Sequence, residues 1–227
     1  MTRILAVVVA SAAFAGLGEG SDALRILDRA PASPDPAAYY LFYLHGRIIE
    51  LQGPEAVSPI FGRYEYQRIL EAFAARGFVV VAEVRPDGAG TAFVEATAEQ
   101  IRGLLAAGVP AGQITVMGFS KGGALALGVS ALVAADEVGY AILAGCFGNA
   151  DRAAQRGPSL RGRFLSLLDR SDRFSPSCKA LFAHAAHVRE REEHVFETGL
   201  DHGLFYEPRA DWVDRVVSWA RPAPSNP

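Results

Sequence analysis

The stretch ITVMGFSKGGALALGVSALVAA, Ile114 to Ala135, passes from one apolar run to another through a serine flanked by glycines. The first run has the composition of a buried strand and the second has the length of a helix. Between them Gly118 to Gly122 fits G-x-S-x-G, in which a sharp strand-to-helix turn presents the serine and the glycines leave room for a neighbouring strand. We predict that Ser120 is a nucleophile. The alternative, a serine that caps the helix, does not explain both glycines.

Outward from this stretch, strand-like apolar runs alternate with helix-like amphipathic runs. Strands are expected at residues 39–46, 78–84, 114–119, 140–145, 163–169 and 194–198, and helices at 64–75, 93–106, 121–135, 177–192 and 210–220. Most strands are continuously apolar, as in a parallel sheet covered on both faces. The alternation predicts a three-layer α/β domain with right-handed crossovers.

Composition limits the class of protein and its partners. The chain has 227 residues, 50% of them hydrophobic and 21% charged, which suits one domain with one core. The net charge is −3 and no dense run of lysine or arginine occurs. We therefore expect neither nucleic acid nor an anionic membrane as a partner, and no cofactor.

The N-terminus is typical of a secretory signal peptide. Arg3 precedes a long uncharged segment, and Ala13-Phe14-Ala15 has the small-x-small form of a cleavage site. The segment is too short for a confident membrane span. We predict a secreted or periplasmic protein with no membrane anchor once the signal is removed. The alternative is that ILAVVVA, residues 4–10, is a buried strand of the domain.

These features divide the chain into four parts. A signal peptide is expected at 1–15, a linker at 16–37, one folded domain at 38–221 and a tail at 222–227. The linker contains three prolines, which oppose regular structure.

The two cysteines, Cys146 and Cys178, each follow a strand-like run. In an exported protein such a pair favours a disulfide between strand ends at one edge of the sheet. The alternative is two buried free thiols. Neither cysteine has the spacing of a metal site.

A nucleophilic serine needs a base to take its proton. His202 lies in the short loop TGLDHGLFYEP, between the last strand and the last helix, and is the predicted base; the alternative is a loop histidine that caps the helix. His184 and His187 are expected on a solvated helix face and not as a metal pair. His194 is expected at the surface.

The base in turn needs a carboxylate that fixes its tautomer. FLSLLDRSDRFSPSC offers Asp169 and Asp172. We prefer Asp172, because Asp169 ends the apolar run and is expected to cap the turn. Asp201 is adjacent to His202 and is a poor orienter, because neighbouring side chains in a loop generally diverge.

Two backbone N–H groups should face the oxyanion that forms during attack. Lys121, directly after the serine, supplies one by its main chain. The loop in YLHGRII supplies the other from Arg47 or Gly46, and His45 is expected to hold the shape of that loop. The alternative for the His-Gly pair is an ordinary turn at a strand end.

The segments YLHGR, GFSKGG, LLDRSD and DHGLFY, in this order, resemble the α/β-hydrolase fold superfamily of serine esterases and lipases. The resemblance runs from about residue 38 to the C-terminus. It implies a triad of Ser120, Asp172 and His202, with an oxyanion hole from the Lys121 and Arg47 main chains. It departs from the full family pattern upstream, where too little chain remains for two further strands. We expect a reduced, mostly parallel sheet of about six strands.

The resemblance also bears on activity. Residues 148–160 leave room for only a short connection, so no large lid is expected, and an open crevice favours esters or thioesters of soluble molecules. The expected function is ester hydrolysis through an acyl-enzyme on a small-molecule substrate. The alternatives are an amidase or peptidase of the same fold and a binding protein without turnover. Four polar side chains are candidates for the border of the site, where they would favour polar substrates, but the preferred interpretation of each is an ordinary surface side chain: Arg47, Glu50, Lys121 and Tyr206.

Overall fold

The computed structural model describes residues 24–148 and 150–221. The expected signal peptide and the expected tail lie outside these residues. Among the residues that are described, no helix combines the length and the apolar character needed to cross a membrane.

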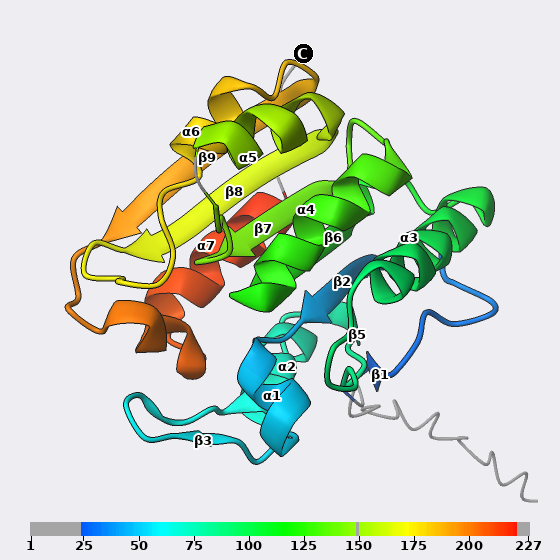
Figure 1. The fold of residues 1–227 in the computed structure, drawn as a ribbon. Coiled ribbons are helices and arrows are strands. Elements are labelled where there is room, and N and C mark those ends of the chain that lie inside the picture. The colour runs from blue at the N-terminus through cyan, green and yellow to red at the C-terminus, as the bar shows by residue number, and fades with distance from the viewer. Residues whose placement is uncertain (1–23, 149, 222–227) are drawn as a thin grey trace, which may run out of the picture.

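The middle layer is a seven-stranded sheet in which all neighbouring strands are parallel (Figure 1). In spatial order the strands are β1 (Ile26–Leu27), β5 (Phe78–Val81), β2 (Tyr39–Leu44), β6 (Ile114–Phe119), β7 (Gly139–Leu143), β8 (Gly162–Asp169) and β9 (Val188–Phe196). The nucleophile segment β6 is the central strand. Buried strands on both sides hold it in place.

The sheet has one strand more than the six expected, and the extra strand corrects the assignment of residues 16–37 as a linker. Ile26 pairs with Val80 and Leu27 with Val81. This short apolar pair precedes the prolines, so nothing in its own sequence prevents it from pairing with the free edge of β5.

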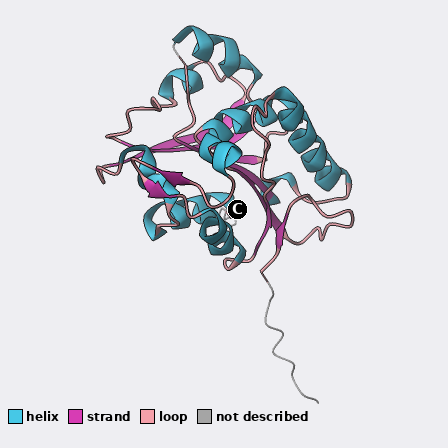
Figure 2. Cartoon of the chain, turned by 60° about the horizontal axis from the view of Figure 1, so that its bottom comes forward, coloured by secondary structure: helices cyan, strands magenta, loops and turns pink. Residues whose placement is uncertain are grey.

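Helices cover both faces of the sheet (Figures 1 and 2). The first core lies under α2 (Tyr66–Ala74) and α7 (Ala210–Ala220), and the second under α3 (Thr91–Ala106), α4 (Lys121–Val133), α5 (Ala150–Arg156) and α6 (Lys179–Ala183). Along β2, Leu41 and Tyr43 enter the first core while Tyr40 and Phe42 enter the second. The predicted three-layer α/β fold is confirmed.

The expected helix at residues 177–192 is wrong over most of its length. Only α6 is helical there, and β9 begins at Val188. The charged residues of this stretch pair across the sheet edge: Arg163 of β8 donates to Glu190 at 2.8 Å, and the Ser166 hydroxyl donates to Glu193 at 3.0 Å. Residues 189–192 are exposed, so their charges suited a strand edge as well as a helix face.

A small hairpin that the sequence did not predict projects beside the carboxyl ends of the strands. It follows α1 (Arg47–Gln52) and consists of β3 (Val57–Ser58) and β4 (Gly62–Arg63). We call residues 53–65 the arm. The Glu65 N–H donates to the Tyr206 carbonyl at 2.8 Å, which ties the arm to the loop after β9.

The expected disulfide is present between Cys146 and Cys178, whose Cα atoms lie 5.2 Å apart. It joins the segment after β7 to the start of α6. Between β7 and β8 the described residues form only α5 and a 3-10 turn at Gly157–Ser159, which agrees with the expectation of no large lid.

Candidate active site

Ser120 stands at the turn between β6 and α4 with φ 53° and ψ −121°. A non-glycine residue with positive φ is uncommon and must be held by its surroundings. The Ser120 N–H donates to the Leu143 carbonyl at 2.8 Å, and the Ser120 carbonyl accepts from the Gly123 N–H at 2.9 Å. The neighbouring strand and the new helix therefore both hold the serine in this conformation.

The glycines around Ser120 allow the backbones to approach closely. A Cβ at Gly122 would lie 1.8 Å from the Leu44 carbonyl oxygen, and one at Gly118 would lie 2.3 Å from the Gly122 oxygen. A Cβ at Gly123 would lie 2.8 Å from the Cα of Gly145. The G-x-S-x-G spacing predicted the contact of Gly122 with a neighbouring strand, which is β2, whereas Gly118 meets the new helix. The contact between Gly123 and Gly145 was missed, because it joins the start of α4 to the segment after β7, which no local pattern relates.

Three side chains that are distant in the sequence form one hydrogen-bonded row. Nε2 of His202 lies 2.9 Å from the Ser120 hydroxyl, and Nδ1 lies 2.8 Å from Oδ2 of Asp172. A carboxylate only accepts hydrogen bonds, so Nδ1 carries the proton and Nε2 accepts from the serine. The Asp172 side chain is 0% exposed and that of His202 is 9% exposed, so bulk water is largely kept from the row.

The other oxygen of Asp172 is held by its own loop. Oδ1 accepts from the Phe174 N–H at 2.8 Å and from the Ser175 N–H at 2.9 Å. Of the acidic side chains considered from the sequence, Asp172 is the one that the structure brings to the imidazole.

Asp169 has a different set of partners. Its carboxylate accepts from the N–H and hydroxyl of Ser171 at 2.9 and 2.5 Å, and from those of Thr198 at 2.8 and 2.6 Å. Burial raises the pKa of Asp169, but the four hydrogen bonds outweigh it and bring the pKa to about 2. Asp169 thus joins the loop after β8 to the loop after β9.

Asp201 also connects two loops and does not contact the imidazole ring through its side chain. Its carboxylate accepts from the Arg173 N–H at 3.0 Å and from the Arg173 guanidinium at 2.7 Å. Burial raises the pKa of Asp201, and the bonds from Arg173 and from the His202 N–H lower it further than burial raises it. The loop that carries the acid and the loop that carries the histidine are therefore fastened together.

The starts of α1 and α4 lie beside the serine. A Cβ on Gly46, which precedes α1, would lie 3.7 Å from the Ser120 Cβ. The first N–H groups of a helix have no partner within that helix. Arg47 and Lys121 are the first residues of the two helices, so the predicted pair of main-chain donors comes from two adjacent helix starts.

An ion cluster joins these two helices. Glu50 of α1 accepts from the Lys121 ammonium at 2.5 Å through one oxygen and from the Arg85 guanidinium at 2.9 Å through the other. The Glu50 and Arg85 side chains are 0% exposed, and Lys121 is 27% exposed. The sequence favoured a surface position for both Glu50 and Lys121, whereas the Glu50 side chain is buried and paired with the Lys121 ammonium.

His45 is buried and belongs to the same cluster. Its Nε2 accepts from the Arg85 N–H at 2.9 Å, so Nδ1 carries the proton and donates to the Gly46 carbonyl at 2.9 Å. The Arg85 side chain also donates to the His45 carbonyl. Burial and the Arg85 charge lower the pKa of His45 to about 3. A neutral His45 in this position holds the loop before α1.

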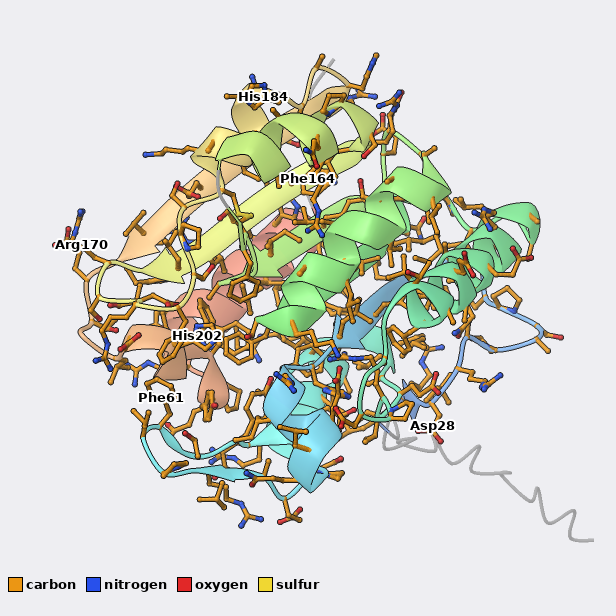
Figure 3. All side chains as sticks on the ribbon, in the orientation of Figure 1. Asp28, Phe61, Phe164, Arg170, His184 and His202 are labelled. Carbon is orange, nitrogen blue, oxygen red and sulfur yellow. A yellow bond between two sulfur atoms is a disulfide. The ribbon has the colours of Figure 1, made fainter. Side chains whose placement is uncertain are left out.

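Aromatic rings surround the His202 imidazole, which Figure 3 labels together with Phe61. The ring centroids of Phe119, Phe174 and Phe61 lie 4.8, 5.3 and 6.3 Å from that of the imidazole. The sequence analysis assigned none of these three rings to the site. Phe174 could have been found from its place two residues after Asp172, whereas no local signal points to Phe61 on the arm.

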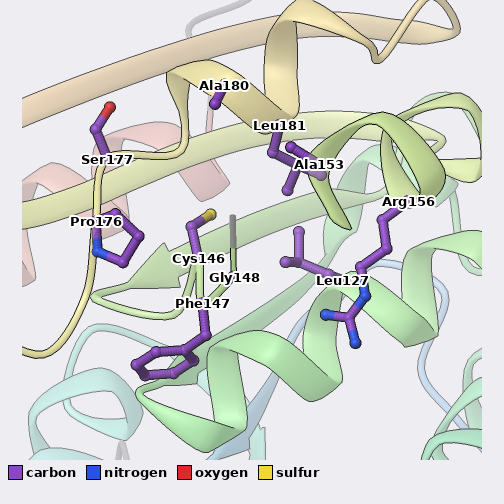
Figure 4. A pocket seen from close by; sticks show the side chains of 10 residues that line it. All are labelled: Leu127, Cys146, Phe147, Gly148, Ala153, Arg156, Pro176, Ser177, Ala180 and Leu181. Atoms are coloured by element: carbon purple, nitrogen blue, oxygen red, sulfur yellow. The ribbon is translucent and has the colours of Figure 1, made fainter. Parts of the chain in front are cut away.

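The other histidines lie outside this row. His184 and His187 are exposed beside α6, and Figure 3 places His184 at the top of the molecule, away from His202. His194 lies on the edge strand β9. A small pocket of about 90 Å³ next to Cys146 and Phe147 (Figure 4) is lined by neither Ser120 nor His202.

Comparisons with solved structures find similar chains. A predicted CIB-like hydrolase from Thermoplasma acidophilum is 17% identical with a TM-score of 0.56, and covers 84% of this chain and 89% of its own. The esterase Pf2001 from Pyrococcus furiosus is 14% identical with a TM-score of 0.54, covering 82% and 83%. Naproxen esterase from Bacillus subtilis is 16% identical with a TM-score of 0.52, covering 82% and 85%.

No protein-family model matches the chain, and no curated protein matches it in sequence. The structural likeness spans most of this chain and of each similar chain, and at these identities it establishes the fold.

Proposed function

We propose that this chain, which has the α/β-hydrolase fold, is a serine hydrolase that cleaves carboxylic esters or thioesters through an acyl-enzyme. The proposal rests above all on the hydrogen-bonded row from Ser120 through His202 to Asp172. Its three residues come from three loops at the carboxyl ends of strands, where α/β folds place their sites. Core packing alone does not require three polar side chains from distant loops to meet in this way.

In the first half-reaction, Oγ of Ser120 attacks the ester carbonyl carbon while Nε2 of His202 takes the hydroxyl proton. The Asp172 carboxylate stabilises the imidazolium and is not protonated itself. The main-chain N–H groups of Lys121 and Arg47 donate to the oxyanion, and one such donor typically contributes about 3 kcal/mol of transition-state stabilisation.

Collapse of the tetrahedral intermediate breaks the bond between the carbonyl carbon and the alcohol oxygen. Nε2 returns its proton to that oxygen, so an alcohol leaves and an acyl-serine remains. In the second half-reaction, His202 takes a proton from water, the hydroxide oxygen attacks the acyl carbon, and Ser120 recovers its proton. The products are an alcohol and a carboxylic acid.

The similar structures include an esterase from Pyrococcus furiosus and a naproxen esterase, which supports esters as the substrate class. Two other functions remain as alternatives: hydrolysis of an amide or peptide by the same residues, and ligand binding without turnover. The intact row disfavours the second alternative, because a binding protein has no use for a base on its serine.

A fluorophosphonate probe tests the proposal, because it reacts only with an activated serine. We expect labelling of the wild type and none of Ser120→Ala. His202→Ala and Asp172→Asn should each lower kcat on short-chain esters about a thousandfold or more, with unchanged thermal unfolding. A folded wild type that neither reacts with the probe nor hydrolyses esters or amides would favour the binding protein.

Export is a separate proposal. The charge pattern of residues 1–15 and the bridge between Cys146 and Cys178 support an oxidising compartment, where disulfides persist. N-terminal sequencing of the protein recovered from the periplasm or medium of an expressing bacterium tests it. The expected result is a mature chain that begins near residue 16, and recovery of only uncleaved protein in the cytoplasm would contradict export.

A further inference from the structure

Two phenylalanines lie against the His202 imidazole without taking part in the hydrogen-bonded row. The centroid of Phe174 is 5.3 Å and that of Phe61 is 6.3 Å from the imidazole, and the two rings are 5.9 Å from each other. Phe61 comes from the arm, between β3 and β4, and Phe174 from the loop that carries Asp172. We call these two rings the aromatic wall.

The aromatic wall is apolar and open to solvent. Phe174 is 51% exposed, and the neighbours of Phe61 include Ile60 at 64% and Leu200 at 42% exposed. Ile60, Phe61 and Leu200 line one hollow of about 520 Å³ beside the histidine loop. Large apolar side chains gathered in this way are typical of a binding surface.

Both residues are held by the row or its neighbours, Phe174 through its backbone and Phe61 through its ring. The Phe174 N–H donates to Oδ1 of Asp172 at 2.8 Å. A Cβ on Gly203 would lie 2.8 Å from the Phe61 ring, so this ring packs directly on the backbone that follows His202. The position of the aromatic wall is therefore tied to that of the imidazole.

The chemistry of the row decides which part of a substrate meets the aromatic wall. The leaving oxygen must accept the proton from Nε2 of His202, so it lies within hydrogen-bond distance of the imidazole. The alcohol substituent begins at that oxygen. It therefore extends from the imidazole, whereas the acyl group extends from the carbonyl carbon on Ser120.

We propose that the aromatic wall binds the alcohol part of the substrate and that this part is apolar, with aryl-alkyl alcohols as the preferred class. The inference rests on the proposed ester hydrolysis. Four charged side chains line the hollow: Arg173, Asp201, Glu207 and Arg209. Arg173 and Asp201 are paired with each other at 2.7 Å, and Arg209 pairs with Asp211 at 3.4 Å, so three of the four are engaged already. The preference for an apolar alcohol rests on the two rings beside the imidazole.

Two isomeric esters test the inference, because they contain the same atoms with the ester reversed. Benzyl acetate has its ring on the alcohol, and methyl phenylacetate has it on the acyl group. We expect Phe174→Ala to lower kcat/KM for benzyl acetate about tenfold and to leave that for methyl phenylacetate nearly unchanged. Leu132→Ala removes another partly exposed apolar side chain, at the far end of α4, and should change neither value.

Labelling of Ser120 by the fluorophosphonate probe in every variant shows that the site is folded. Equal loss on both esters, or loss on methyl phenylacetate alone, would overturn the aromatic wall as an alcohol site while ester hydrolysis stands. A wild type that is neither labelled nor active on any ester would overturn the proposed function together with this inference.

Discussion

At the scale of single residues, the two aspartates of the loop after β8 divide the work between them. Asp172 contacts the imidazole, and Asp169 joins two loops through four hydrogen bonds to Ser171 and Thr198. The sequence placed both at one strand end. Their roles differ because a carboxylate at the very end of the strand reaches the adjacent loop, while one three residues later reaches the histidine.

The lowered pKa of Asp169 predicts a pH-dependent stability. Its pKa falls from 3.8 to about 2 on folding, so its carboxylate stabilises the fold above about pH 4, and this contribution of about 2 kcal/mol is lost as the pH falls to about 2. We expect Asp169→Asn to lower the free energy of unfolding near neutral pH. The loss of stability on going from pH 4 to pH 2 should be smaller in this variant.

Urea unfolding at about pH 7, 4 and 2 measures this difference. Asp172→Asn is the comparison, because it should lower kcat far more than Asp169→Asn does. A larger loss of kcat in Asp169→Asn would mean that the acid has been assigned to the wrong residue.

At the scale of elements, the site depends on how α1 and α4 are held together. Glu50 of α1 binds Lys121 of α4 at 2.5 Å, and the first N–H of each helix is a proposed oxyanion donor. We expect Lys121→Met to lower kcat about tenfold with KM nearly unchanged, because a shifted donor weakens only the transition state. Lys121→Arg should restore most of the rate.

Steady-state kinetics on a short-chain ester provides the measurement. Lys179→Met, on the exposed side of α6, is the matched control and should behave as the wild type. A rise in KM at constant kcat would place the Lys121 ammonium in ground-state binding of the substrate.

The glycines of the helices give a second prediction at this scale. A Cβ at Gly122 would lie 1.8 Å from a backbone oxygen, whereas one at Gly103 in α3 meets no atom within 4 Å. We expect Gly122→Ala to cost at least about 3 kcal/mol of stability through overpacking. Gly103→Ala should instead stabilise the protein by about 0.5–1 kcal/mol, because alanine favours a helix interior.

Thermal or chemical unfolding of the two variants measures both changes in stability. A Gly122→Ala protein as stable as the wild type would show that α4 can move away from β2 at little cost.

What the sequence could predict at this scale follows from local pattern. The central elements were found because β6 and α4 are long, apolar and joined by G-x-S-x-G. The sequence pattern of Val188 to Glu192 predicts a helix and not the strand that forms there, because alternating charges on an exposed edge strand resemble a solvated helix face. The arm escaped prediction because its two short strands carry no periodic pattern and its position depends on contacts with Tyr206 and Gly203.

At the scale of the whole molecule, the disulfide joins parts of the chain that are 32 residues apart in sequence. In a chain-entropy model, closure of such a loop stabilises the folded protein by roughly 3–4 kcal/mol. We expect the double variant Cys146→Ala with Cys178→Ala to have a free energy of unfolding lower by this amount, and therefore to unfold at a lower urea concentration. Ser120 should stay reactive towards the fluorophosphonate probe.

A reducing agent should lower the stability of the wild type and leave the double variant unchanged. Equal stability of the wild type with and without the reductant would mean that the bridge adds little to the native fold.

The edge strand β9 affects whether copies of the protein associate with one another. An unpaired strand edge invites the same strand of another copy to extend the sheet, which is how many proteins begin to form fibrils. Residues 189–192 present a run of exposed arginines and glutamates on this edge, and a joining strand would have to strip water from them. The same charges that made β9 resemble a helix in the sequence thus oppose self-association. Replacing them with threonine or valine would make this sheet edge prone to aggregation.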